Sequence, residues 1–81
     1  MEEFNAIIAS DLAEIEKLAQ AFAWVTGRII EHAHKEIELA QAMHDRETVV
    51  KGQIKMSTLE HAREVFEFCY IRATGRRPWD E

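Results

Sequence analysis

Residues 28–44, RIIEHAHKEIELAQAMH, are dense in side chains that bind metals or transfer protons. Three histidines and three glutamates fall within these 17 residues. Carboxylate and imidazole groups are ligands for zinc, iron and manganese, and both can act as general acids or bases. Glu31 and His34 also match the Glu-x-x-His spacing of di-iron helical bundles. The chemistry of this segment depends on which of these side chains share one side of a helix.

Helical geometry separates most of these side chains. Successive residues of a helix lie about 100° apart, so His32 and His34 point to nearly opposite sides and cannot bind one ion together. Glu31 and His34 both fall on the polar side, away from the apolar positions of the segment. We therefore interpret them as a solvated face, on which Glu31 and Lys35 form a weak pair four positions apart.

Glu36 is the exception, because it falls inside the apolar arc of the same helix. A carboxylate there is costly unless a cation or hydrogen-bond donor pairs with it. The favoured interpretation is a paired polar layer that fixes how two helices align, with no metal or other cofactor. The alternative is a metal-dependent helical-bundle enzyme or metal carrier, in which the two chains of a dimer both supply ligands. The candidate ligands are Glu36, His32, His44 and His61.

Two tryptophans lie outside the main apolar stripe and are candidates for binding a protein partner. Trp24 has Arg28 one helical turn further on, and an aromatic residue beside an arginine is typical of interface hot spots. Trp79 stands in the C-terminal tail, directly after Arg76, Arg77 and a proline. We expect Arg28, Arg76 and Arg77 to bind the partner together with the two tryptophans. The alternative for each tryptophan is an intramolecular role. Trp24 would then pack against the N-terminal residues or inside a homodimer, and Trp79 would fold back onto the helices.

The elements that must position these residues are helices. Apolar residues recur three, four and seven positions apart from Ile8 to Met43, which is the period of an amphipathic helix. We predict an all-α, antiparallel helical hairpin whose first helix is long, from about residue 3 or 11 to about residue 50. The alternative is that this long helix is broken near Gly27.

The second helix of the hairpin is predicted to be shorter. Gly52 suits the left-handed position that closes a helix. Ser57 and Glu60 then form a capping box, which starts a new helix over about 58–74. Residues 75–81 form a C-terminal tail, and the whole chain of 81 residues is a single all-helical domain.

This difference in length predicts a homodimer. A helix of about 40 residues is about 60 Å long, whereas one of about 17 residues reaches about 26 Å. The shorter helix would leave part of the apolar stripe uncovered. It is also apolar around most of its circumference, which is typical of a helix buried on several sides. Both features favour a dimeric four-helix bundle over a monomeric three-helix bundle.

The composition and motifs of the chain argue against several classes of function. The net charge of −5 argues against direct binding to nucleic acid. Cys69 is the single cysteine, which is typical of a reducing compartment such as the cytoplasm, and we expect it in the apolar core. We expect neither a secretory signal nor a membrane-spanning helix. We also expect that the protein is not an enzyme, since no complete catalytic motif is present. The favoured function is a small acidic module that binds a larger protein as a regulator, inhibitor or adaptor, of the type encoded by phages, plasmids and bacterial operons.

Overall fold

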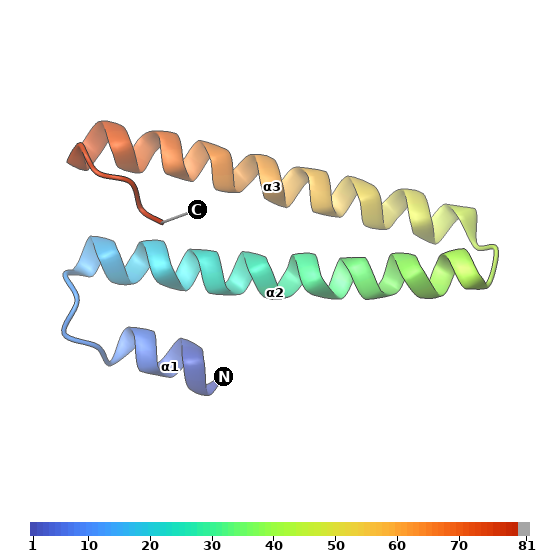
Figure 1. Ribbon diagram of the computed structural model, residues 1–81, viewed down its shortest axis with the longest axis horizontal. Helices are drawn as coiled ribbons and strands as arrows, with labels where there is room; N and C mark the ends of the chain where they lie inside the picture. Colours follow the sequence, from blue (N-terminus) through green and yellow to red (C-terminus); the bar gives the residue numbers. More distant parts are fainter. Residues whose placement is uncertain (80–81) are drawn as a thin grey trace.

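The computed structural model describes residues 1–79, which form three helices and no strand. α1 spans Glu2–Ile8, α2 spans Glu14–Ala42 and α3 spans Arg46–Thr74. Each helix runs antiparallel to the one before it, and α2 lies between α1 and α3 (Figure 1). The predicted all-α class is therefore confirmed, and the two long helices form a hairpin.

The turn of the hairpin lies earlier than predicted. α2 ends at Ala42, so the predicted end near residue 50 is wrong. His44 takes the left-handed backbone conformation, with φ at 57°, that reverses the chain. Histidine is among the few residues besides glycine that are enriched in this region. The reversal therefore needs no glycine.

Asp45 is the N-cap that starts α3. Its carboxylate accepts hydrogen bonds from the backbone N–H of Thr48 at 3.2 Å and from the Thr48 hydroxyl at 2.6 Å. The first bond satisfies an amide that the first turn of the helix leaves unpaired. The Thr48 hydroxyl is also the main reason why the pKa of Asp45 is lowered from its ordinary value. A local cap thus fixes the beginning of α3 at Arg46.

Gly52 lies inside α3, so the predicted break over residues 52–57 is wrong. The glycine is buried against Ile37 of α2, where the two helices approach closely. Ser57 and Glu60 are exposed in the middle of the same helix, where the amides are already paired, and the predicted start near residue 58 is also wrong. Close packing between helices, rather than chain reversal, explains the glycine.

The two helices of the hairpin are equal in length. α2 and α3 have 29 residues each, so each is about 43 Å long. The predicted mismatch between a long and a short helix is wrong, and a homodimer can no longer be argued from it. Within residues 1–79, neither helix carries the extended apolar run that crossing a membrane requires.

The N-terminal residues form a separate element. α2 is continuous through Gly27, which rules out a break there. Residues 2–8 belong to α1 and do not extend α2, as one of the predicted helix starts required. The Ser10 hydroxyl donates a hydrogen bond to the carbonyl of Ile7 at 2.6 Å, just after α1 ends. The chain then turns, and α1 folds back along α2.

Small and aromatic residues fill the space between α2 and α3. Near the turn, Ala33, Ile37 and Ala40 are buried. At the other end of the hairpin, the rings of Phe22 and Phe66 stack with centroids 4.6 Å apart. Cys69 is exposed, so its predicted place in the core is wrong.

Candidate functional site

Trp24 is half-buried beneath α1. Its indole N–H donates a hydrogen bond to Oε2 of Glu3 at 2.8 Å, and its ring lies 5.9 Å from that of Phe4 between centroids. The guanidinium of Arg28 stands 5.9 Å from the centroid of the indole. A buried indole usually needs an acceptor for its N–H, and Glu3 supplies one. Trp24 therefore anchors α1 to α2, which corresponds to the intramolecular alternative in the sequence analysis.

A shallow depression surrounds this anchor between α1 and the middle of α2. It is mixed in character, with acidic, basic and apolar side chains at its edge. The residues lining it are Met1, Glu2, Glu3, Trp24, Arg28, Ile29 and His32. Arg28 forms a long ion pair with Glu31, 3.7 Å between Nη1 and Oε2, so both Trp24 and Arg28 have partners within the chain. Their binding of an external partner stays a prediction.

Trp79 folds back onto the hairpin. Its indole N–H donates to the carbonyl of Ala19 at 2.9 Å. Its ring stacks with Phe66 and Phe22, at 5.6 Å and 6.4 Å between centroids, and the guanidinium of Arg63 lies 5.3 Å from the ring centroid. The aromatic cluster of the core thus continues into the C-terminal tail.

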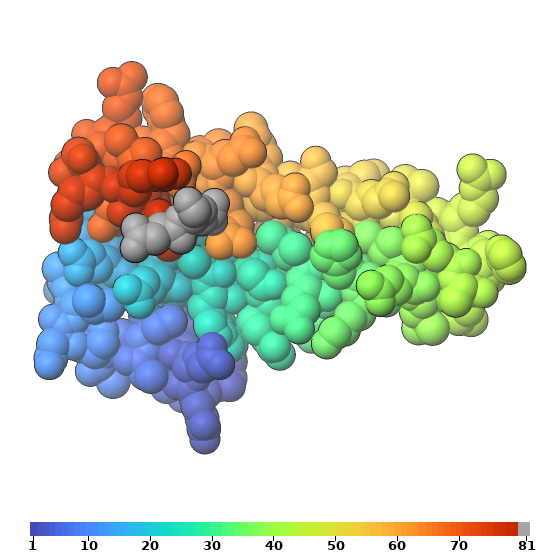
Figure 2. Space-filling model, in the orientation of Figure 1, coloured from blue at the N-terminus to red at the C-terminus, as the bar shows by residue number. Residues whose placement is uncertain are grey.

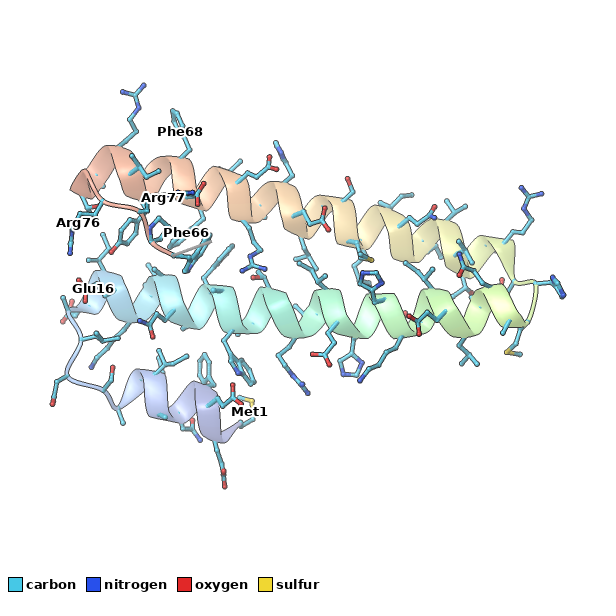
Figure 3. The ribbon with its side chains drawn as sticks, in the orientation of Figure 1. Met1, Glu16, Phe66, Phe68, Arg76 and Arg77 are labelled. Carbon is cyan, nitrogen blue, oxygen red and sulfur yellow. The ribbon has the colours of Figure 1, made fainter. Side chains whose placement is uncertain are left out.

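Two ion pairs hold the same tail. Arg76 bonds to Oε1 of Glu16 at 3.0 Å, and Arg77 lies 3.7 Å from Oε2 of Glu67. The tail therefore crosses the seam between α2 and α3 and contacts both helices (Figure 2). Figure 3 shows Arg76 and Glu16 together at the end of the hairpin. The last part of the predicted tail, residues 80–81, lies outside the described residues.

The candidate metal ligands do not converge within one chain. Glu36 is half-exposed and lies 4.0 Å from Nζ of Lys55, so its pairing partner is a lysine of α3. His61 is exposed and lies 3.8 Å from Glu64, while His44 stands in the turn and His32 borders the depression at α1. Among the residues that the structure describes, no three histidine, cysteine or acidic side chains are grouped to hold a metal ion. Metal binding by ligands from two chains stays a prediction, and metal analysis of the purified protein tests it.

Sequence reasoning missed the most exposed apolar surface of α3. We call it the outer ridge. It consists of Val50, Ile54, Val65 and Phe68. Figure 3 shows Phe66 directed into the space between α2 and α3 and Phe68 directed away from α2. The guanidinium of Arg72 lies 5.1 Å from the centroid of Phe68, which gives this surface an aromatic residue beside an arginine.

The spacing of the outer ridge was visible in the sequence. Residues 50, 54, 65 and 68 fall on one side of a helix, but only if the helix begins before residue 50. The predicted bounds divided the ridge, because they left Val50 in the first helix, Ile54 in the break over residues 52–57 and only Val65 and Phe68 in the second helix. Comparison of the chain with protein-family models, curated proteins and solved structures found no match.

Proposed function

We propose that this protein is a small acidic binding module that acts on a larger protein as a regulator, inhibitor or adaptor, and that the outer ridge is its contact surface. The observation that carries the proposal is the exposure of Phe68, whose accessible surface is 60% of the maximum. α3 is the helix at the edge of the molecule (Figure 1), and Phe68 is directed away from α2 (Figure 3). A phenylalanine in that position contributes little to the fold of a single chain.

The chemistry of the ridge suits protein recognition. Its four side chains lie within residues 50–68 of α3, a span of 19 residues and about 27 Å of helix. An apolar line on one side of a helix fits into the groove of a partner, and its anchors recur at helical intervals. Phe68 with Arg72 supplies a pairing that is enriched at interface hot spots. The partner surface is therefore expected to be an apolar groove.

Charge adds a second requirement on the partner. The chain carries a net charge of −5, which accelerates association with a basic surface and slows association with an acidic one. Acidic residues are concentrated at the N-terminal end of the chain, in Glu2, Glu3, Asp11, Glu14 and Glu16. A partner with an apolar groove bordered by basic residues meets both requirements, and its association should slow as salt is added.

Affinity purification from the organism that encodes the chain tests this proposal. The chain is tagged, and the wild type is compared with Phe68→Glu and with Leu39→Glu. Leu39 is a matched control, because it is 63% exposed and lies on α2. We expect a stoichiometric partner to copurify with the wild type and with Leu39→Glu. Loss of a hot-spot aromatic costs about 2 kcal/mol or more, so Phe68→Glu should weaken binding by about 30-fold.

Two results would contradict the proposal. One is a partner that binds Phe68→Glu as tightly as the wild type, which would move the contact surface elsewhere. The other is equal loss with both variants, which would indicate general damage. Trp24→Ala and Trp79→Ala, measured in the same assay, test the binding roles predicted for those residues from the sequence.

A further inference from the structure

The molecule is thin for a folded domain. Its Cα atoms extend over 46 × 29 × 16 Å, so the three helices form one layer. Domains normally pack two layers around a core. Among the described residues, the buried apolar ones are mostly alanines, and no large side chain is completely buried. The chain therefore has the architecture of one half of a helical core.

The exposed area supports the same conclusion. The accessible surface is 6124 Å², whereas a compact monomer of 9.4 kDa is expected to expose about 5,000 Å². The excess is about 1,100 Å². A standard protein interface buries about 800 Å² on each partner. The surface left uncovered is thus large enough for one additional interface of ordinary size.

One broad side of the layer is suited to that interface. We call it the groove face. It consists of Ile8 of α1 and Leu18, Val25 and Ile29 of α2, all exposed. An apolar groove runs between α1 and α2 on this side. Ile8, Leu18 and Val25 of the groove face line it, together with Phe4, Ala21 and Phe22. Leu18 is two positions from Glu16, so it points to the side opposite the Arg76–Glu16 pair and the C-terminal tail.

We propose that a second copy of this chain covers the groove face, in a two-fold symmetric dimer. Stacking two such layers would enclose the apolar side chains of both, and the two hairpins would form a four-helix bundle. The dimer uses a different surface from the outer ridge, so it is independent of the function proposed above.

Charge at the groove favours a second copy over an unrelated partner. Glu14 and Lys17 both line the groove, and within residues 1–79 neither has an ion-pair partner. In a two-fold contact, whatever residue i meets on the other chain also meets residue i in return. Glu14 of each chain can therefore face Lys17 of the other, so that two symmetry-related ion pairs satisfy all four charges.

Sedimentation velocity over a range from micromolar to hundreds of micromolar tests the dimer, with reductant present because Cys69 is exposed. The wild type should sediment as a dimer. Leu18→Glu should raise the dimer dissociation constant at least about tenfold, while helix content by circular dichroism is unchanged. Phe68→Glu is the matched control on the outer ridge and should dimerise like the wild type.

A charge exchange tests whether Glu14 of one chain faces Lys17 of a second copy. Glu14→Lys alone should weaken the dimer, and Glu14→Lys combined with Lys17→Glu should restore it. A wild type that stays monomeric throughout the concentration range would overturn the proposal, as would Leu18→Glu dimerising as strongly as the wild type. Dissociation by Phe68→Glu instead of Leu18→Glu would also overturn it, and would assign self-association to the outer ridge.

Discussion

Gly52 of α3 and Ile37 of α2 approach so closely that a Cβ on the glycine would lie 2.6 Å from Cγ1 of Ile37 and 3.0 Å from its Cδ1. Real Cβ atoms do not tolerate the shorter distance. Ile37 is buried, and its β-branched side chain has few alternative rotamers. The absence of a side chain at residue 52 therefore sets how closely the two long helices pack.

Gly52→Ala should destabilise the protein despite the helical preference of alanine. Alanine in place of a helical glycine is favourable by about 1 kcal/mol, but forcing a methyl group into a packed contact costs about 1–3 kcal/mol. We expect the free energy of unfolding, measured by urea denaturation, to decrease. Gly27→Ala is the matched control, because no atom lies within 4 Å of a Cβ there, and it should increase stability by about 1 kcal/mol. Equal stabilisation by both variants would show that the helices can separate without loss.

The position of the turn shows what sequence reasoning could and could not predict here. Helical periodicity predicted the helices, and Gly52 and Ser57 predicted the turn between them, but the chain reverses at His44 and Asp45. Local preferences alone favoured the glycine. α3 starts at the Asp45 cap, and Gly52 lies inside it in close contact with Ile37. That contact depends on tertiary packing, so no local pattern predicts it.

The candidate functional residues were predicted only in part, for the same reason. Trp24 and Trp79 were recognisable as aromatic residues outside the stripe. α1 covers Trp24, and the C-terminal tail returns to Ala19. Both contacts depend on reversals of the chain, which helical spacing does not predict. The exposure of Phe68 was not predicted, because the wrong turn placed this residue in a shorter helix that was expected to be buried on several sides. A prediction that α3 starts at the Asp45 cap would have placed all four residues of the outer ridge on one side of a single helix.

The Asp45 cap should make stability depend on pH. Hydrogen bonds from Thr48 lower the pKa of Asp45 in the folded state below its unfolded value. The stabilisation is therefore complete at neutral pH and is lost as the pH falls below about 4, through the folded-state pKa. Asp45→Ala should lower the midpoint of thermal unfolding at pH 7. The difference from the wild type should shrink as the solution is acidified.

Asn provides the control for that experiment. Asp45→Asn keeps an oxygen that accepts from the amide of Thr48, and it carries no titrating group. Its thermal midpoint should lie close to that of the wild type, and the gap between Asp45→Asn and Asp45→Ala should persist at acidic pH. An Asp45→Ala deficit that is constant from pH 7 to strong acid would mean that the ionised cap contributes nothing.

Trp79 should stabilise the hairpin more than the ion pairs of the tail. Its ring joins Phe22 and Phe66, so Trp79→Ala should lower the free energy of unfolding by about 2 kcal/mol, less than for a fully buried tryptophan. Trp79→Phe keeps the stacking but loses the bond to the Ala19 carbonyl, worth about 1 kcal/mol. Arg76→Ala removes a surface ion pair and should cost less than about 1 kcal/mol. Urea denaturation measures these losses in the free energy of unfolding. A loss for Arg76→Ala as large as that for Trp79→Ala would contradict the expected order.

Trp24 should determine whether α1 is docked. α1 has seven residues, and a helix this short is unstable in water by itself, because isolated helices below about 12 residues are marginal. Trp24→Ala removes the contact with Phe4 and the donor to Glu3. The amides of α1 should then exchange with solvent at the rate of an unfolded chain, while those of α2 and α3 stay protected. Hydrogen exchange followed by mass spectrometry measures both regions in one sample.

Glu3→Gln is the conservative control, since its amide oxygen can still accept from the indole and α1 should remain partly protected. Loss of α1 in Trp24→Ala would also remove Phe4 and Ile8 from the wall of the groove. Dimerisation should then weaken even though no residue of α2 on the groove face has changed. If α1 stays protected in Trp24→Ala, other contacts hold it, and the indole of the wild type is not required as the anchor of α1.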